Sequence, residues 1–309
     1  DSVGGCARLE GPVETHVAFF LTSAAGACLE DVGEDPFFLR VDPWGPHPPY
    51  IVGGPYEGSV DPDSVALPEN FDTKLSNRPQ HHADYSAYWA NTLSLTDREW
   101  RLMAARAQEH TMLVEAAMVQ ILETLDVLDL TDRTLVIFCA DHGDAVASNG
   151  RVSNKGGLMV EETMRVPLLV AGPGLGTASV DERLATNMDL PATILDYCGV
   201  SSDQNLHGRS LLGSRADGRG ALMTQHYGLH ERLIQRALYQ QNWKYVIQES
   251  GFEELYDLET DPFELDNLSH ASSSRQLLQQ MRRDLLSEMN RTGDGEPAIL
   301  SHLASATSS

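Results

Sequence analysis

Two aspartates and a histidine stand together directly after an apolar run of this chain. In the segment TLVIFCADHGD, residues 134–144, strand-forming residues precede Asp141, His142, Gly143 and Asp144. Carboxylates this close together repel one another unless a cation lies between them. Carboxylate oxygens suit Ca²⁺ and Mg²⁺, and a neighbouring imidazole also admits Mn²⁺ or Zn²⁺. The spacing therefore predicts a divalent-metal site on Asp141 and His142; the simpler alternative is that the two aspartates only cap a turn.

A lysine in a glycine-rich segment follows this group. The chain has three lysines: Lys74, Lys155 and Lys244. Lys155 lies fourteen residues after Asp141, in the segment NKGGLMVEETMRVPLL. A compact ammonium group beside glycines can approach an anionic ligand closely, so Lys155 is a candidate anion-binding residue. Glu161, Glu162 and Arg165 are more simply interpreted as a local ion-pair group.

His47 supplies a second imidazole, in the segment GPHPPY. The preceding residues, Phe37 to Val41, predict a short buried strand, and the prolines after it cannot continue a ladder. A lone histidine is more often structural than functional. However, ligands of open α/β sheets bind just beyond the carboxyl ends of strands. Because both strand ends offer cation or metal chemistry, we expect the residues at 47, 141–142 and 155 to form one shared site.

The elements that must position these residues alternate between helical and strand patterns. Helices are expected over residues 13–31, 97–127 and 187–199, and apolar strands at 37–41, 134–140 and within 165–174. Residues 52–97 are rich in Gly, Pro, Asp and Asn and predict a long, mostly irregular surface excursion. The alternation is typical of an α/β fold, and the apolar run 134–140 predicts a strand of a mostly parallel sheet flanked by helices.

The pattern changes near residue 220. The segments RALYQQNWKYVIQ and EELYDLETDPFE predict hairpin strands, and residues 272–291 predict an amphipathic helix. We therefore expect three parts: part of an α/β domain at 1–219, a small antiparallel-sheet α+β subdomain at 220–291, and a flexible tail at 292–309.

Composition excludes some partners. The formal net charge of −23 over 309 residues argues against nucleic acid or an anionic membrane surface. No apolar run of about 18 residues predicts a membrane span. The four cysteines are too scattered for a zinc ribbon or a disulfide scaffold, and Cys139 and Cys198 are expected to be small core residues. The sequence starts at Asp1 rather than Met, so neither location nor a signal peptide can be read from it, and oligomeric state leaves no pattern.

Taken in order, these segments resemble the sulfatases of the alkaline-phosphatase-like superfamily over nearly the whole chain. DPFFLRVDPWGPHPPY resembles the strand that leads to a substrate-contacting histidine, here His47. ILETLDVLDLTDRTLVIFCADHGD resembles the strand that ends in two metal ligands, here Asp141 and His142. NKGGLMVEETMRVPLLVAGPG resembles the segment whose lysine, here Lys155, holds the sulfate group. QNWKYVIQESGFEELYDLETDPFELDNLS resembles the small C-terminal sheet of the family.

The resemblance implies a sulfuric ester hydrolase. In that family a hydrated formylglycine attacks the sulfur, and a divalent metal, here Ca²⁺ first with Mg²⁺ or Mn²⁺ as alternatives, activates the nucleophile and offsets charge. Lys155 and His47 would stabilise the sulfate oxygens or protonate the departing alcohol. The expected partner is a small-molecule or glycan sulfate ester.

Two departures from the family pattern limit this expectation. Sulfatases also carry a pair of metal-binding aspartates and a Cys/Ser-x-Pro-x-Arg motif, and neither Cys6 nor Cys28 begins such a motif. We therefore expect a C-terminal fragment that lacks the N-terminal nucleophile and metal-aspartate block and hydrolyses sulfate esters poorly, or not at all, by itself. Asn149 stands where many relatives carry a histidine, which bears on the details of the substrate site.

Two alternative functions stay open. One is a phosphonate or phosphate-diester hydrolase of the same superfamily, since those enzymes commonly place a histidine beside the metal-binding aspartate, as His142 would be. The other is a non-catalytic relative that binds anionic ligands or has a structural role.

Overall fold

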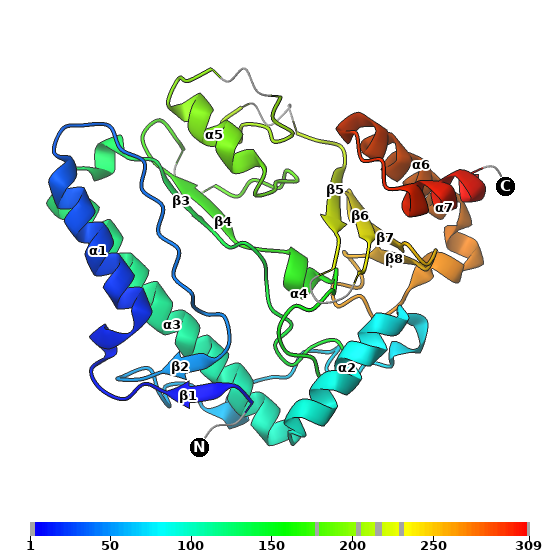
Figure 1. Ribbon diagram of the computed structural model, residues 1–309, viewed down its shortest axis with the longest axis horizontal. Helices are drawn as coiled ribbons and strands as arrows, with labels where there is room; N and C mark the ends of the chain where they lie inside the picture. Colours follow the sequence, from blue (N-terminus) through cyan, green and yellow to red (C-terminus); the bar gives the residue numbers. More distant parts are fainter. Residues whose placement is uncertain (1–3, 177–178, 202–204, 214–217, 229–231, 308–309) are drawn as a thin grey trace.

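The computed structural model describes residues 4–176, 179–201, 205–213, 218–228 and 232–307. Two long helices form one side of the molecule, a four-stranded sheet with its helices forms the other, and two short strand pairs and several loops lie between them (Figure 1). The mixed α/β class predicted from the sequence is confirmed, together with the small antiparallel sheet near the C-terminus.

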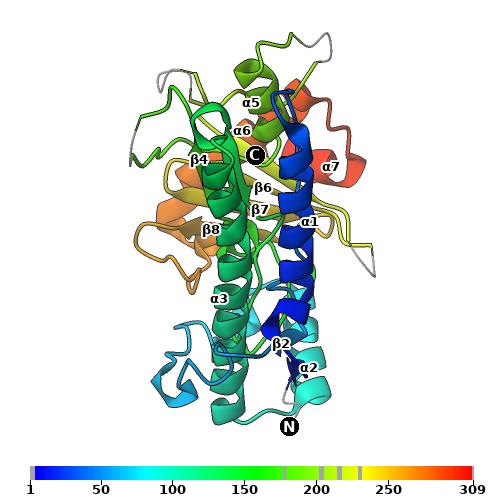
Figure 2. The same cartoon turned by 90° about the vertical axis from the view of Figure 1, so that its left-hand side faces the viewer.

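The predicted helix over residues 97–127 is present as α3 (Asp97–Val127). It begins with a capping box, in which Thr96 Oγ1 accepts the backbone N–H of Glu99 and the Glu99 carboxylate accepts that of Thr96. Helix α1 (Val17–Val32) packs along it (Figure 2). Their contact is apolar and is formed by Ala18, Phe19, Leu113, Val114 and Ala117. This pair is the scaffold against which the segment containing His47 lies.

The first four strands form two separate pairs. Strands β1 (Cys6–Arg8) and β2 (Tyr50–Val52) are parallel, whereas β3 (Val136–Cys139) and β4 (Leu168–Ala171) are antiparallel. The strands expected at 134–140 and within 165–174 therefore exist. The expectation that the first is a buried strand of a mostly parallel sheet is wrong, because its only ladder partner in the described chain is antiparallel and Phe138 is 48% exposed.

Two burial predictions also fail in this region. The buried strand expected at 37–41 is not formed, since these residues pair with no strand in the described ranges, and Phe38 is 72% exposed. Without a neighbouring strand, Phe37 and Phe38 remain at the surface, and Leu39 packs half-buried against the cluster of Leu29, Leu125 and Leu130. Cys139 and Cys198 are likewise exposed rather than in the core.

The excursion at 52–97 is less irregular than expected. Its first part has only short 3₁₀ turns, but Gln80–Leu93 forms helix α2. The sequence of α2 is rich in His, Tyr, Asn and Ser, which are weak helix formers, so its helicity depends on packing. Downstream, the short α4 (Glu161–Met164) precedes β4, and α5 (Asp189–Tyr197) confirms the helix expected at 187–199.

The C-terminal elements form the largest apolar core in the described chain. Four antiparallel strands are adjacent in chain order: β5 (Leu222–His226), β6 (Gln235–Gln240), β7 (Trp243–Gln248) and β8 (Glu253–Asp257). Helix α6 (Arg275–Thr292) packs on this sheet, as predicted. The flexible tail expected at 292–309 is wrong, because α7 (Pro297–Thr307) buries Ile299 and Leu303 completely in the same core. Proline at the first helical position and apolar residues four apart explain this helix.

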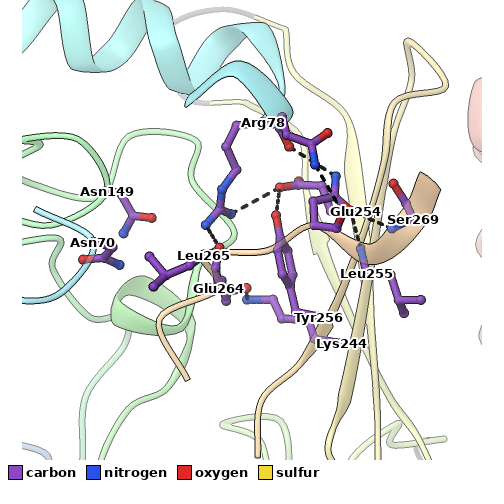
Figure 3. A network of polar contacts seen from close by, with 12 residues as sticks. Asn70, Arg78, Asn149, Lys244, Glu254, Leu255, Tyr256, Glu264, Leu265 and Ser269 are labelled. Carbon is purple, nitrogen blue, oxygen red and sulfur yellow. Dashed lines mark hydrogen bonds and ion pairs between the residues drawn. The ribbon is translucent and has the colours of Figure 1, made fainter. Parts of the chain in front are cut away.

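A buried polar network joins the C-terminal sheet to the rest of the chain. Lys244 of β7 forms ion pairs with Glu264 at 2.8 Å and with Glu161 of α4 at 3.2 Å. Arg78, just before α2, donates to Glu254 and to the carbonyl oxygen of Glu264 (Figure 3). The network holds α2, α4 and the sheet together. The division of the chain at residues 219 and 220 stays a prediction.

The helices in the described ranges include none that is both long and apolar enough to span a membrane.

Candidate active site

His47 and Lys155 meet although they come from distant segments. The Lys155 Nζ atom lies 3.0 Å from Nε2 of His47, and Nδ1 of His47 lies 2.5 Å from the carbonyl oxygen of Pro48. A lysine ammonium group has no acceptor, so His47 Nε2 must accept the hydrogen bond. The proton of the imidazole is then on Nδ1, which donates to Pro48. The geometry thus specifies a neutral His47 tautomer and a lysine donor aimed at it.

The loop that carries Lys155 has a constrained backbone. Ala147, Asn149, Arg151 and Asn154 all have positive φ angles between 49° and 67°. Such conformations are uncommon for residues other than glycine and persist only where surrounding contacts hold them. The side chain of Asn154 provides one such contact, because its Oδ1 accepts the backbone N–H of Lys155 at 2.7 Å. The lysine is therefore presented by a specified loop conformation.

Asp141 and His142 follow β3 directly, as predicted. The His142 Nε2 atom lies 3.5 Å from Asp141 Oδ2, and the backbone N–H of His142 donates to Asp141 Oδ1 at 3.0 Å. The other ring nitrogen, Nδ1, lies 2.8 Å from the carbonyl oxygen of Gly143, so it is the donor. This leaves Nε2 as the free acceptor of the neutral imidazole, next to an Asp141 side chain that is 87% exposed.

Gly143 permits the turn that separates these residues from Asp144. Its N–H donates to the carbonyl oxygen of Thr163 at 2.8 Å. A Cβ atom at Gly143 would lie 2.0 Å from the carbonyl oxygen of Glu162, so no larger residue fits. Helix α4 therefore lies directly against the backbone that follows His142.

The acidic residues of α4 support this loop. The local ion-pair group expected of Glu161, Glu162 and Arg165 is not formed among these described residues, because Glu161 pairs instead with Lys244 of the distant strand β7. Glu162 instead accepts hydrogen bonds from Asn70 at 2.6 Å and from the buried Asn149 at 3.1 Å, while Arg165 is exposed. Asn149 thus supports Glu162 from inside the protein.

Asp144 faces three groups that can carry positive charge. Burial raises the pKa of its carboxyl group, while His47, Lys155 and His142 act in the opposite direction. The pKa of the Tyr50 hydroxyl is raised by burial first and then by the nearby Asp144. In the sequence, Asp144 was considered as one of two closely spaced carboxylates or as a turn cap, but it was not assigned to the site. The structure adds it to the group around Lys155, and its place in the same tetrapeptide was the available signal.

Asp141 and His142 are donors that suit part of a divalent-metal site. Asp141 and His142 offer a carboxylate oxygen and an imidazole nitrogen 3.5 Å apart, close to the roughly 3 Å expected between adjacent ligands of one ion with bonds of about 2.3 Å. Within the described ranges no group of three or more His, Cys, Asp or Glu side chains is arranged to hold a metal ion. The two residues thus fit as part of a metal site, and further donors are needed to complete it.

The structure brings together the residues that the sequence placed in one site. The ring centroids of His47 and His142 are 6.3 Å apart, and the ring of Trp44, which was not predicted to belong to the site, lies 4.9 Å from that of His47 at an angle of 51°. The roles of His47 and Lys155 in catalysis, and of Asp141 and His142 in metal binding, stay predictions.

Comparison with known proteins identifies the family. The sequence model named Sulfatase matches residues 12–200, and the model named N-sulphoglucosamine sulphohydrolase, C-terminal, matches residues 154–291. The chain belongs to the sulfatase family. This confirms the resemblance seen in the sequence, within the alkaline-phosphatase-like superfamily.

Individual relatives agree with this assignment. The chain is 24% identical over 318 residues to the multifunctional alkaline phosphatase superfamily protein PehA of Trinickia caryophylli, covering 91% of this chain and 62% of that protein. It is 28% identical over 226 residues to arylsulfatase K of Homo sapiens, covering 68% and 41%. The chain therefore spans only about half the length of such relatives.

Solved structures share the fold. A 2-O GAG sulfatase is 25% identical and superimposes with a TM-score of 0.68 over 85% of this chain and 56% of that one. A phosphonate monoester hydrolase from Silicibacter pomeroyi is 20% identical, with a TM-score of 0.78 over 91% and 61%. The second likeness concerns the fold alone.

Proposed function

We propose that the protein to which this chain belongs is a sulfuric ester hydrolase. The observation that carries the proposal is the 3.0 Å contact between Lys155 and His47 beside Asp141 and His142. It provides cationic and hydrogen-bonding groups for an oxyanion next to two candidate metal ligands. The family assignment supports the same conclusion.

In this proposal Lys155 binds the sulfate oxygens. When a sulfate ester enters, the ammonium group exchanges its hydrogen bond with neutral His47 for one with a charged oxygen, which is the stronger type. Its positive charge then offsets the charge that develops on the sulfate during attack. His47, released from Lys155 but still held through Nδ1 by Pro48, directs Nε2 at the same ligand. Once Nε2 has taken a proton from solvent, it could donate that proton to the departing alcohol oxygen, which leaves the imidazole neutral again.

Asp141 and His142 are the proposed metal ligands, through a carboxylate oxygen and Nε2. A divalent ion at this point would supply Lewis-acid stabilisation of the sulfate and of the nucleophile. We propose Ca²⁺ as the ion, with Mg²⁺ or Mn²⁺ as alternatives, because hard oxygen ligands predominate in the expected set. The attacking formylglycine expected in this family would have to come from outside these residues, since the sequence has no Cys/Ser-x-Pro-x-Arg motif.

The proposed substrate is a small-molecule or glycan sulfate ester, in keeping with arylsulfatase K and the 2-O GAG sulfatase among the similar proteins. A second candidate, a phosphonate or phosphate-diester hydrolase, is favoured by the histidine at position 142 and shares the fold of a phosphonate monoester hydrolase. A sulfate ester and a phosphonate monoester both place a single negative charge on the oxygens that Lys155 would bind.

The two candidates are separated by kinetics on matched aryl esters. A protein that carries this chain together with the upstream sequence of its gene would be assayed with an aryl sulfate and with an aryl phosphonate that share the same leaving group. We expect a kcat/KM for the sulfate about tenfold or more above that for the phosphonate, the factor that roughly 1.4 kcal/mol of transition-state preference gives. The reverse ratio would favour the second candidate, and turnover of neither would favour a non-catalytic relative.

A further inference from the structure

A side chain from the C-terminal sheet contacts the loop that presents Lys155. Gln235 is the first residue of β6 and is completely buried. Its Nε2 atom donates a hydrogen bond of 2.7 Å to the carbonyl oxygen of Gly157, two residues after Lys155. The contact joins segments 78 residues apart in the sequence.

The backbone at Gly157 lies tightly against the same sheet. A Cβ atom there would lie 2.5 Å from Cδ2 of Leu233 and 3.2 Å from Nε2 of His226. The absence of a side chain at Gly157 thus allows its backbone to approach β5 and β6 closely enough to receive the Gln235 donor. The contact therefore depends on both residues: Gly157 allows the close approach, and Gln235 supplies the donor.

The turn between Lys155 and Gly157 is closed on its other side as well. The Leu158 N–H donates to the carbonyl oxygen of Lys155 at 3.1 Å. Tyr85 of α2 covers Gly156, whose absent Cβ would lie 2.5 Å from the tyrosine ring. With Tyr85 on one side and Gln235 on the other, movement of the Gly157 carbonyl would also move the backbone of Lys155.

The amide of Gln235 is only half satisfied. Its Oε1 atom is buried and has no hydrogen-bond partner among the described residues. A buried acceptor without a partner destabilises a protein, so an apolar side chain of similar length would suit a purely structural position better. The hydrogen bond to Gly157 is the interaction that an amide adds at this position.

We propose that Gln235 is a positioning residue for the anion site: it fixes the Lys155–Leu158 turn and thereby sets the place of the Lys155 ammonium group. The inference rests on the proposed role of Lys155 in binding sulfate. It assigns to the C-terminal sheet a direct part in that site, distinct from the ion pairs of Lys244.

The test uses Gln235→Met, which keeps the side-chain length and removes the donor. The control is Gln225→Met, because Gln225 lies on the adjacent strand β5 but its amide donates to Asp294 at 3.1 Å rather than to the loop; Gln248 is unsuitable, since its partner His81 also contacts the Gly157 backbone. Amide hydrogen exchange of peptides covering residues 154–158 and the Kd of inorganic sulfate by titration calorimetry are measured for both variants and the native chain.

Gln235→Met is expected to speed exchange in residues 154–158 and to weaken sulfate binding about tenfold, while Gln225→Met changes each by less than about twofold. Unchanged exchange in Gln235→Met would overturn the proposal, as would faster exchange with unaltered sulfate affinity. A further outcome is that the native chain binds no sulfate while exchange in residues 154–158 is faster in Gln235→Met alone. That result would support the Gln235–Gly157 contact as the one that fixes the turn, and it would contradict the proposed role of Lys155 in binding sulfate.

Discussion

The ammonium nitrogen of Lys155 lies 3.0 Å from Nε2 of His47, although 108 residues separate the two in the sequence. Because the lysine can only donate, the contact determines which nitrogen of the imidazole carries the proton. It also shows that the proline-rich segment after residue 41 and the loop after β3 converge. An anion that binds between these side chains would take the place of His47 Nε2 as the acceptor of the Lys155 hydrogen bond, so that a charged acceptor replaces a neutral one.

Substitution of this lysine should weaken anion binding. Lys155→Met removes a hydrogen bond to a charged group, worth roughly 1.5–3 kcal/mol, so the Kd of inorganic sulfate is expected to rise about 10- to 100-fold. Titration calorimetry measures the change. Lys74→Met is the control, because Lys74 is exposed and distant in sequence from the site. Equal affinities of Lys155→Met and the native chain would remove Lys155 from the proposed site.

A methyl group at Gly143 should not be tolerated. Gly143→Ala would place its Cβ 2.0 Å from the carbonyl oxygen of Glu162, so the α4 backbone must move. We expect a loss of about 3 kcal/mol in the free energy of unfolding, at the upper end for overpacking. Urea denaturation measures it. In Gly220→Ala the new Cβ meets no atom within 4 Å, so its stability should change by less than about 1 kcal/mol. Similar stabilities for the two variants would contradict the close approach of α4.

The buried ion pairs of Lys244 should be costly to break from one side. Lys244 is completely buried, and Lys244→Met would leave Glu264, which is 1% exposed, without its cation. The expected loss is about 3–5 kcal/mol of unfolding free energy, the usual cost of an uncompensated buried charge. Arg98→Met, which removes an exposed ion pair with Asp63, should cost about 0–1 kcal/mol. The midpoints of denaturant unfolding measure both losses, provided that the slope of unfolding free energy against denaturant is unchanged. Equal losses in Lys244→Met and Arg98→Met would argue against the buried network.

Acid should destabilise the fold through two buried histidines. Burial lowers the pKa of both His81 and His110 from 6.5 to about 4, with neighbouring histidines acting in the same direction. Between these values the unfolded chain binds more protons than the folded one, so stability is complete above pH 6.5 and is lost as the pH falls toward 4. Each histidine could contribute up to about 3 kcal/mol at the acid end.

Unfolding free energies measured from about pH 7 to about pH 4.5 test this prediction. His110→Gln should flatten the pH dependence, whereas substitution of the exposed His207 should leave it as it is. A native chain whose stability is the same across this range would show that neither imidazole is held neutral.

Much of the fold could be predicted because its patterns are local. Helix α3 has a long apolar periodicity and a capping box, and the β6–β7 hairpin has alternating strand residues around a short turn, so both were expected within a few residues. The convergence of His47, His142 and Lys155 was also predicted, but the rule that ligands bind beyond strand ends holds here only for β3, since no described strand leads directly to His47, and the resemblance to sulfatases supplied the rest.

The failures concern properties that depend on neighbours. An apolar run such as 37–41 shows that a strand could be buried but not which element covers it; here no described strand pairs with it, and only Leu39 packs against Leu29 and Leu125 of α1 and α3. Helix α7 is short and rich in Ser and Ala, and its order comes from two side chains that reach the core of α6 and the sheet. The contact of Gln235 with Gly157 has no sequence signal, because Gln235 belongs to no motif and nothing in the glycine-rich segment around Lys155 indicates which strand packs against Gly157.

One feature of the β3–β4 pair affects how the isolated chain will behave in solution. Phe138 and Leu169 are cross-strand partners and therefore lie on the same face, where they are 48% and 59% exposed. A short two-stranded ladder with an exposed apolar face has edge strands whose backbone groups can pair with a strand of another molecule. We therefore expect Phe138→Thr to keep the β3–β4 ladder and to leave more of the protein in solution at high concentration.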